Sequence, residues 1–302
     1  MKVNILKNLI IFFPSRLIPG VIGFFSLPYL ASIFSLEEYG KFTLIFSLIT
    51  FLSTLGSSWL TSIIIRFDSI YPRKILNQIL LNISFSSLLF INIIWIIVYK
   101  YYLANLLIKN IFFLGIFWFV SEIAFIYIAA WYRSSSSSKF YSILFSIRSI
   151  FYFSFLLIFP KIINFTYQIP FFVFPLSSLL SITIIYPFSK EILNFNSNNI
   201  QYNISQKAII FREILQYGVP SAAINLVTIL LSLGDRFVIQ YFLGSIFVAK
   251  YSLIYDLSEK SILFINSIFL LATSSEAFKI FDKSGENKST KLIEELTKQY
   301  IL

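Results

Sequence analysis

Long stretches without a charged residue constrain this chain more than any other feature. Five such runs, each at least 20 residues long, occupy residues 17–36, 42–65, 75–99, 162–189 and 214–234. A helix needs about 20 mainly apolar residues to cross a hydrocarbon core about 30 Å thick. Charged residues make up only 13% of the chain, against about 25% in an average soluble domain. We therefore expect an all-α integral membrane protein.

The apolar pattern predicts about eight transmembrane helices. Their expected ranges are 8–33, 42–65, 75–99, 111–130, 140–159, 169–188, 214–242 and 251–272. Three prolines, Pro14, Pro19 and Pro28, predict that the first helix is broken or bent. Residues 37–40 are expected to form a tight turn after it. The Asn-rich stretch within 189–213 predicts the main linker.

The distribution of basic residues predicts the orientation in the membrane. The amino terminus, the even-numbered connections and the carboxyl-terminal tail carry more than twice as many Lys and Arg residues as the odd-numbered connections. Basic residues accumulate in cytoplasmic connections. The amino terminus is therefore expected in the cytoplasm.

An internal repeat relates the two ends of the chain. Residues 39–48 (YGKFTLIFSL) align with residues 248–257 (VAKYSLIYDL) at a constant offset of 209, with four identities. Self-similarity of this kind in a helical membrane protein indicates structural repeats, here two with the same orientation in the membrane. We therefore expect residues 1–198 to form a six-helix lobe. Residues 199–302 would begin a parallel second lobe with its first two helices.

Two residue types are missing altogether. The chain contains no His and no Cys, which excludes thiolate chemistry, disulfides and imidazole catalysis. We expect no cofactor and no metal site. The net charge of +10 could attract nucleic acid in a soluble protein, but here the basic residues mostly flank apolar spans. Membrane lipids, and not nucleic acid, are therefore the expected partners of these charges.

Several short segments, taken in order along the chain, resemble one protein family. They are Ser35–Gly40 (SLEEYG), Leu55-Gly56 followed by Ile65–Phe67 (IRF), Gln216–Pro220 (QYGVP), Gly234–Ile239 (GDRFVI) and Tyr241–Gly244 (YFLG). From about residue 8 to the end, the chain is similar to the O-antigen and capsule flippases of polysaccharide biosynthesis. That family belongs to the multidrug/oligosaccharidyl-lipid/polysaccharide exporter superfamily.

The resemblance implies a function and a location. Such a protein moves a lipid-linked oligosaccharide, of the undecaprenyl-diphosphate type, across the bacterial inner membrane by alternating access. Polysaccharide polymerase machinery would be a further partner. The chain departs from the family in length, because relatives carry about twelve spans. We accordingly expect a truncated product that inserts into the membrane and is inactive alone.

Charged residues inside the predicted spans are the candidate substrate-binding residues, because a buried charge in a bilayer costs about 2.5–3.5 kcal/mol. Arg16, Glu122 and Arg148 fall at similar depth, about 12 Å from the cytoplasmic boundary. The second group, near the outer side, consists of Asp235, Arg236 and Lys260, with Asp256 and Glu259 nearby. Arg66 ends the second span and is a candidate for recruiting headgroups.

Each candidate has a purely structural alternative. Arg16 and Arg148 could extend to the inner headgroups, with Glu122 neutralising one of them. Asp235 and Arg236 could pair with each other at the outer interface, and Arg66 could serve only as a topology anchor. The repeat favours function for Arg16 and Lys260, because their counterparts Ala222 and Phe51 are uncharged.

Three functions remain open at this point. The first is the flippase, favoured by an excess of cations inside the membrane that suits an anionic diphosphate lipid. The second is a cation-coupled drug exporter of the same superfamily, with Glu122 or Asp256 as the coupling carboxylate. The third is a membrane glycosyltransferase or polymerase. We do not expect an enzyme, because the longest loop between spans, 189–213, holds only two acidic residues and no His.

Overall fold

The computed structural model describes residues 2–103, 110–134, 138–162, 166–190, 192–193, 203–259, 290 and 294. Within these ranges the chain is helical and contains no strand. The helices are α1 (Lys2–Ile33), α2 (Leu36–Phe67), α3 (Arg73–Val98), the π-helical η1 (Tyr99–Leu103), α4 (Ile111–Ser134), α5 (Ser138–Ile162), α6 (Ile169–Ile185), the 3₁₀-helical η3 (Tyr186–Phe188) and α7 (Ile204–Leu243). Residues 245–259 form a further helix.

Six helices, α2 to α7, are long and apolar enough to cross a membrane. Residues Leu17–Ile33 of α1 form a shorter apolar helical segment. Helices satisfy their backbone hydrogen bonds internally, which the hydrocarbon core requires. The chain is thus a multi-pass membrane protein that is helical throughout its described elements, as predicted. The eighth predicted span, 251–272, is described only as far as residue 259.

The first helix was predicted to be broken or bent at its prolines, and it is continuous, so it is not broken there. Pro14, Pro19 and Pro28 all lie inside α1. A proline removes one backbone hydrogen bond, and in a membrane helix neighbouring helices and Ser or Thr side chains can compensate for it.

The predicted turn at residues 37–40 was also wrong, because these residues form the first turn of α2. Ser35 is the N-cap: the Glu38 amide donates to Ser35 Oγ at 3.3 Å, and the Ser35 amide donates to Glu38 Oε2 at 3.0 Å. This reciprocal capping box satisfies two backbone donors and sets where the helix starts. The connection from α1 to α2 is therefore shorter than expected.

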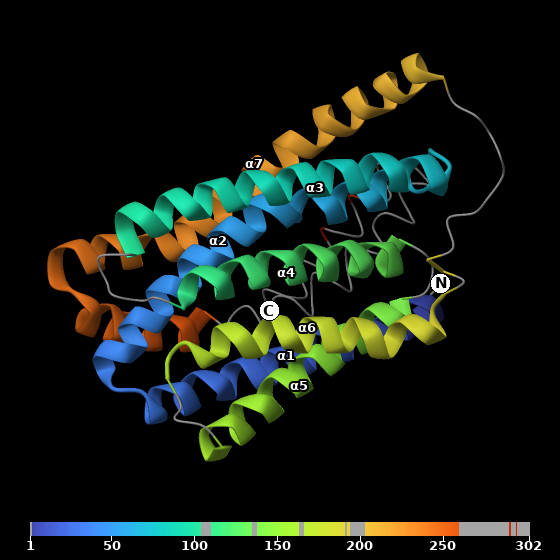
Figure 1. The fold of residues 1–302 in the computed structure, drawn as a ribbon. Coiled ribbons are helices and arrows are strands. Elements are labelled where there is room, and N and C mark those ends of the chain that lie inside the picture. Colours follow the sequence, from blue (N-terminus) through green and yellow to red (C-terminus); the bar gives the residue numbers. More distant parts are fainter. Residues whose placement is uncertain are drawn as a thin grey trace.

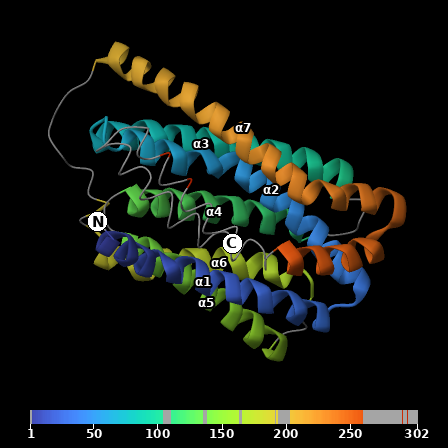
Figure 2. The same ribbon diagram turned by 180° about the vertical axis from the view of Figure 1, so that it is seen from behind.

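Helix α7 begins ten residues earlier than predicted, within the expected linker. The amide of Asn203 donates to Gln206 Oε1 at 3.0 Å, which fixes the helix start. The helix then runs for 40 residues. At 1.5 Å per residue this is about 60 Å, roughly twice the hydrocarbon thickness. In Figures 1 and 2 its amino-terminal end projects beyond the other helices.

The helices pack around α2 and α4. Helix α4 contacts α2, α6, α3 and α5, while α7 packs against α2. Helices α1, α5 and α6 form the opposite side of the bundle in both views (Figures 1 and 2). Although α1 and α2 are consecutive, α1 packs mainly on α5 and touches α2 little. The two helices diverge from their connection, and this divergence leaves room for a cavity between them.

The helix at residues 245–259 approaches α2 closely at one glycine. A Cβ added to Gly40 would lie 1.9 Å from the Ser245 carbonyl oxygen, so only glycine allows this contact. The starts of these two helices, Leu36 and residue 245, are separated by 209 residues. This is the offset of the sequence repeat, so the aligned segments begin their helices at equivalent positions.

Candidate functional site

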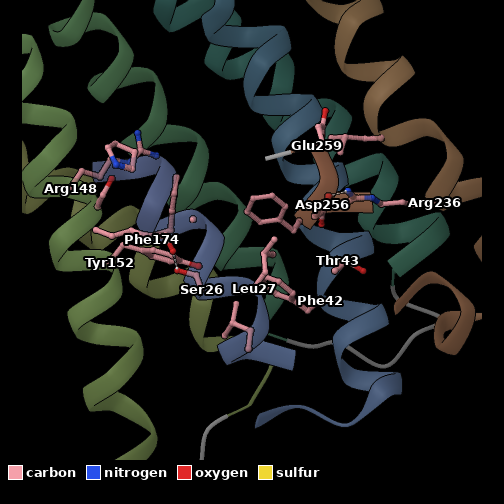
Figure 3. Close-up of a pocket in the computed structure, with 17 residues that line it drawn as sticks. Ser26, Leu27, Phe42, Thr43, Arg148, Tyr152, Phe174, Arg236, Asp256 and Glu259 are labelled. Carbon is pink, nitrogen blue, oxygen red and sulfur yellow. Dashed lines mark hydrogen bonds and ion pairs between the residues drawn. The ribbon is translucent and has the colours of Figure 1, made fainter. Parts of the chain in front are cut away.

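Four charged residues line a cavity of about 310 Å³ between α1 and α2. Its walls come from α1, α2, α5, α6, α7 and the helix at residues 245–259. The charged lining residues are Arg148, Arg236, Asp256 and Glu259. Figure 3 shows Arg148 and Arg236 approaching from opposite sides. The structure thus brings to one cavity residues from both charge groups that the sequence placed at different depths.

Arg148 of α5 is held by Glu122 of α4. Arg148 Nη2 donates to Glu122 Oε2 at 2.5 Å and Nη1 to Oε1 at 3.4 Å. The two side chains are 8% and 16% exposed. The guanidinium carbon lies 4.1 Å from the ring centre of Phe125 and 4.0 Å from that of Phe174. Planar stacking of this kind is available to Arg and not to Lys.

The second arginine, Arg236 of α7, connects three helices. Its Nη1 donates to Ser47 Oγ of α2 at 2.9 Å, and its Nη2 donates to Asp256 Oδ1 in the following helix. Arg236 is 2% exposed. Its Nε–H is buried without an acceptor among the described residues. A buried donor left unpaired is costly, so an acceptor that reached this group would stabilise it.

The predicted alternative that Asp235 pairs with Arg236 was wrong. Successive residues on a helix point about 100° apart, and here they engage different partners. Tyr251 Oη donates to Asp235 Oδ2 at 2.7 Å, while Arg236 engages Asp256. The neighbouring carboxylate of Glu259 accepts a hydrogen bond of 2.9 Å from Ser232.

The cavity does not show the expected excess of cations. Among its described lining residues, two arginines face two carboxylates. Arg148 is paired with Glu122 and Arg236 with Asp256. In a medium of low dielectric constant, the desolvation free energy of an isolated charge is very unfavourable, and an ion pair offsets part of it. An anionic substrate would therefore exchange with these carboxylates.

The other predicted site residues are not brought into this cavity by the described part of the structure. The side chain of Arg16 and all of Lys260 lie outside the described residues. The α1 backbone next to Arg16 does approach α5, since Ser146 Oγ donates to the Pro14 carbonyl at 3.4 Å. Arg66 is exposed at the end of α2 and does not line the cavity.

Sequence reasoning missed a second cavity, also of about 310 Å³, which is lined by α2, α4 and α6. Six Ser and Thr residues of α2 line it: Thr50, Ser53, Thr54, Ser57, Ser58 and Thr61. Their spacing of three and four residues places them on one helix face. That periodicity can be seen in the sequence and could have predicted a polar face on α2. We call this space the hydroxyl chamber.

The fold and the site define a class: a multi-pass helical membrane protein with paired charges around an internal cavity. A sequence profile described as "Polysaccharide biosynthesis protein" matches residues 5–273. Since the match covers most of the chain, this protein belongs to the polysaccharide biosynthesis family of transporters. Comparisons with curated proteins and with solved structures gave no match.

Proposed function

We propose that this chain serves in the movement of a lipid-linked oligosaccharide across the bacterial inner membrane, for the synthesis of a surface polysaccharide such as O-antigen or capsule. Arg148 and Arg236 facing one internal cavity carry the proposal. The substrate would be of the undecaprenyl-diphosphate type, and a polysaccharide polymerase would receive the product. The chain acts as a transporter and not as an enzyme.

The two arginines suit a diphosphate because each presents a planar fork of donors. In this structure the guanidinium groups of Arg148 and Arg236 are paired with Glu122 and Asp256. Diphosphate oxygens would displace them while the unpaired Nε–H of Arg236 supplies a further donor. Because the protein exchanges one anionic partner for another, it can bind the substrate without holding it irreversibly.

The proposed arrangement around the site has two parts. Residues 1–198 form the first lobe and residues 199–302 begin the second, with the amino terminus in the cytoplasm. Arg148 belongs to the first part and Arg236 to the second. Alternating access would then vary the separation of the two arginines, which would tie phosphate binding to the conformational change. Arg16 and Lys260 are proposed to add positive charge to the same path, whereas Arg66 would attract headgroups at the membrane surface.

Deletion of the gene in its own host tests this function. We expect loss of surface polysaccharide and accumulation of the lipid-linked saccharide in the inner membrane. Reversal of both by a plasmid copy of these 302 residues would also show that the expectation of a chain inactive alone was wrong. A plasmid copy carrying Arg148→Gln and Arg236→Gln should reach the membrane without restoring export. Normal surface polysaccharide in the deletion strain would contradict the proposal.

A cation-coupled drug exporter is the second candidate, and the carboxylates in the cavity favour it. Glu259 and Asp256 line the space where a cationic substrate would bind. This candidate predicts that the deletion strain keeps its surface polysaccharide and becomes more sensitive to cationic dyes. The same strain therefore separates the two functions.

A further inference from the structure

The hydroxyl chamber contains buried donors that the protein leaves unused. Ser53 is 4% exposed, and its Oγ has no hydrogen-bond partner among the described residues; the same is true of Ser58 Oγ. Serines in apolar helices usually donate to a carbonyl one turn earlier. Ser57 does so at 2.8 Å, to the Ser53 carbonyl. Because unpaired buried hydroxyls are costly, two of them in one cavity indicate a polar occupant.

Aromatic side chains line the same chamber. Trp118 of α4 and Phe174 of α6 stack with ring centres 4.2 Å apart and planes inclined by 9°. Both rings line the chamber, together with Phe46 of α2. A pyranose ring has apolar C–H faces and hydroxyl groups around its edge, so a space lined by both aromatic and hydroxyl side chains suits it.

The chamber adjoins the cavity that holds the two arginines. Phe46 and Phe174 line both spaces. Arg148 lines the cavity and its partner Glu122 lines the chamber, so their ion pair lies at the boundary. In a lipid diphosphate saccharide the sugar is attached directly to the phosphate. The order of the two spaces therefore follows the order of the chemical groups in such a molecule.

We propose that the hydroxyl chamber binds the first sugar of a diphosphate-linked saccharide while the arginines bind its phosphates. This inference rests on the proposed function and assigns a subsite to it. Ser53 and Ser58 would bond the sugar hydroxyls, and Phe46 and Trp118 would border the ring. A lipid tail would leave these hydroxyls unpaired, and Glu122 is already neutralised by Arg148, so neither a tail nor a cation matches the chamber as well.

Two water-soluble probes test the inference with the purified full chain in detergent. The first is farnesyl diphosphate, which carries the phosphates without a sugar. The second is farnesyl diphosphate linked to N-acetylglucosamine. We expect wild-type protein to bind the second probe more tightly, with a change in tryptophan fluorescence that Trp118→Phe removes.

The double variant Ser53→Ala/Ser58→Ala should bind the sugar-bearing probe about tenfold more weakly, as expected for two lost hydrogen bonds. Its affinity for farnesyl diphosphate should stay within about twofold of wild type. Folding should survive, because neither hydroxyl has a protein partner in the described structure. The matched control is Ser86→Ala/Thr228→Ala, which removes two exposed hydroxyls on α3 and α7 and should leave both affinities unchanged.

Other outcomes separate the two levels of the proposal. If wild type binds both probes and the double variant binds both as wild type does, the chamber holds only water and the inference fails while the proposed function stands. Equal weakening of both probes would likewise overturn the sugar assignment. If wild type binds neither probe, the proposed function fails and the subsite fails with it.

Discussion

Arg148 combines an ion pair with aromatic stacking, and the two contributions can be separated by substitution. Arg148→Lys keeps the charge but loses the planar contact with Phe125 and Phe174. We expect it to retain a small part of export, while Arg148→Gln retains none. Surface polysaccharide, measured at equal membrane levels of the protein, checks this order. Equal export by Arg148→Lys and wild type would show that charge alone is needed.

Substitution of Glu122, the partner of Arg148, distinguishes an effect on stability from an effect on export. Arg148→Gln leaves Glu122 buried without its cation, which costs about 3–5 kcal/mol. The double variant Arg148→Gln/Glu122→Gln removes both charges. It should therefore recover most of the thermal stability in detergent and still fail to export. Recovery of export as well would mean that Arg148 has only a structural role.

At the scale of helices, the contact between α2 and residue 245 depends on Gly40. A Cβ there would meet the Ser245 carbonyl oxygen at 1.9 Å, and that oxygen belongs to the backbone and cannot rotate away. Gly40→Ala should separate the two helices and lower the unfolding temperature in detergent. Gly234→Ala is the control, because no atom lies within 4 Å of a Cβ added at Gly234. It should leave stability unchanged or raise it by up to about 1 kcal/mol, through helix propensity.

Gly244 ends α7 in a conformation that other residues avoid. Its φ is 85° and its ψ is 176°, a region that is essentially restricted to glycine and costs other residues about 1–3 kcal/mol. Gly244→Ala should therefore destabilise the chain by about that amount, measured by thermal unfolding in detergent. The ion pair between Arg236 and Asp256 spans this turn, so export should fall as well. An unchanged unfolding temperature would contradict this account.

For the whole molecule, the orientation in the membrane can be tested with single cysteines, since the chain has no Cys of its own. Leu36→Cys lies at the start of α2 and Ser205→Cys near the start of α7, and both positions are exposed. With the amino terminus in the cytoplasm, an impermeant maleimide should label only Leu36→Cys in intact cells. Both should react after permeabilisation. Labelling of Ser205→Cys alone in intact cells would show that the orientation is the opposite one.

The sequence was most informative where a single helix decides the outcome. The length of the apolar stretches located the helices. Glu122 and Arg148 fall at similar depth in their predicted spans, and this predicted that they lie near each other. Helix starts were missed because they depend on side-chain capping at Ser35 and Asn203, which apolar length does not report. The contact of Arg236 with Asp256 was missed because it depends on how α7 and the next helix turn about their axes. The hydroxyl chamber depends on which face of α2 turns inward, and only packing decides that.

The length of α7 has a mechanical consequence. Arg236 lies near one end of this continuous helix and Ile204 begins the other, about 50 Å away. Pro220 lies between these two points and removes one backbone hydrogen bond, so the stretch from Pro220 to Arg236, about 24 Å long, is the arm that moves as one piece. A tilt of about 5° that shifts Arg236 only slightly would move the Pro220 end by about 2 Å. Binding at Arg236 would then change the position of α7 well away from the cavity.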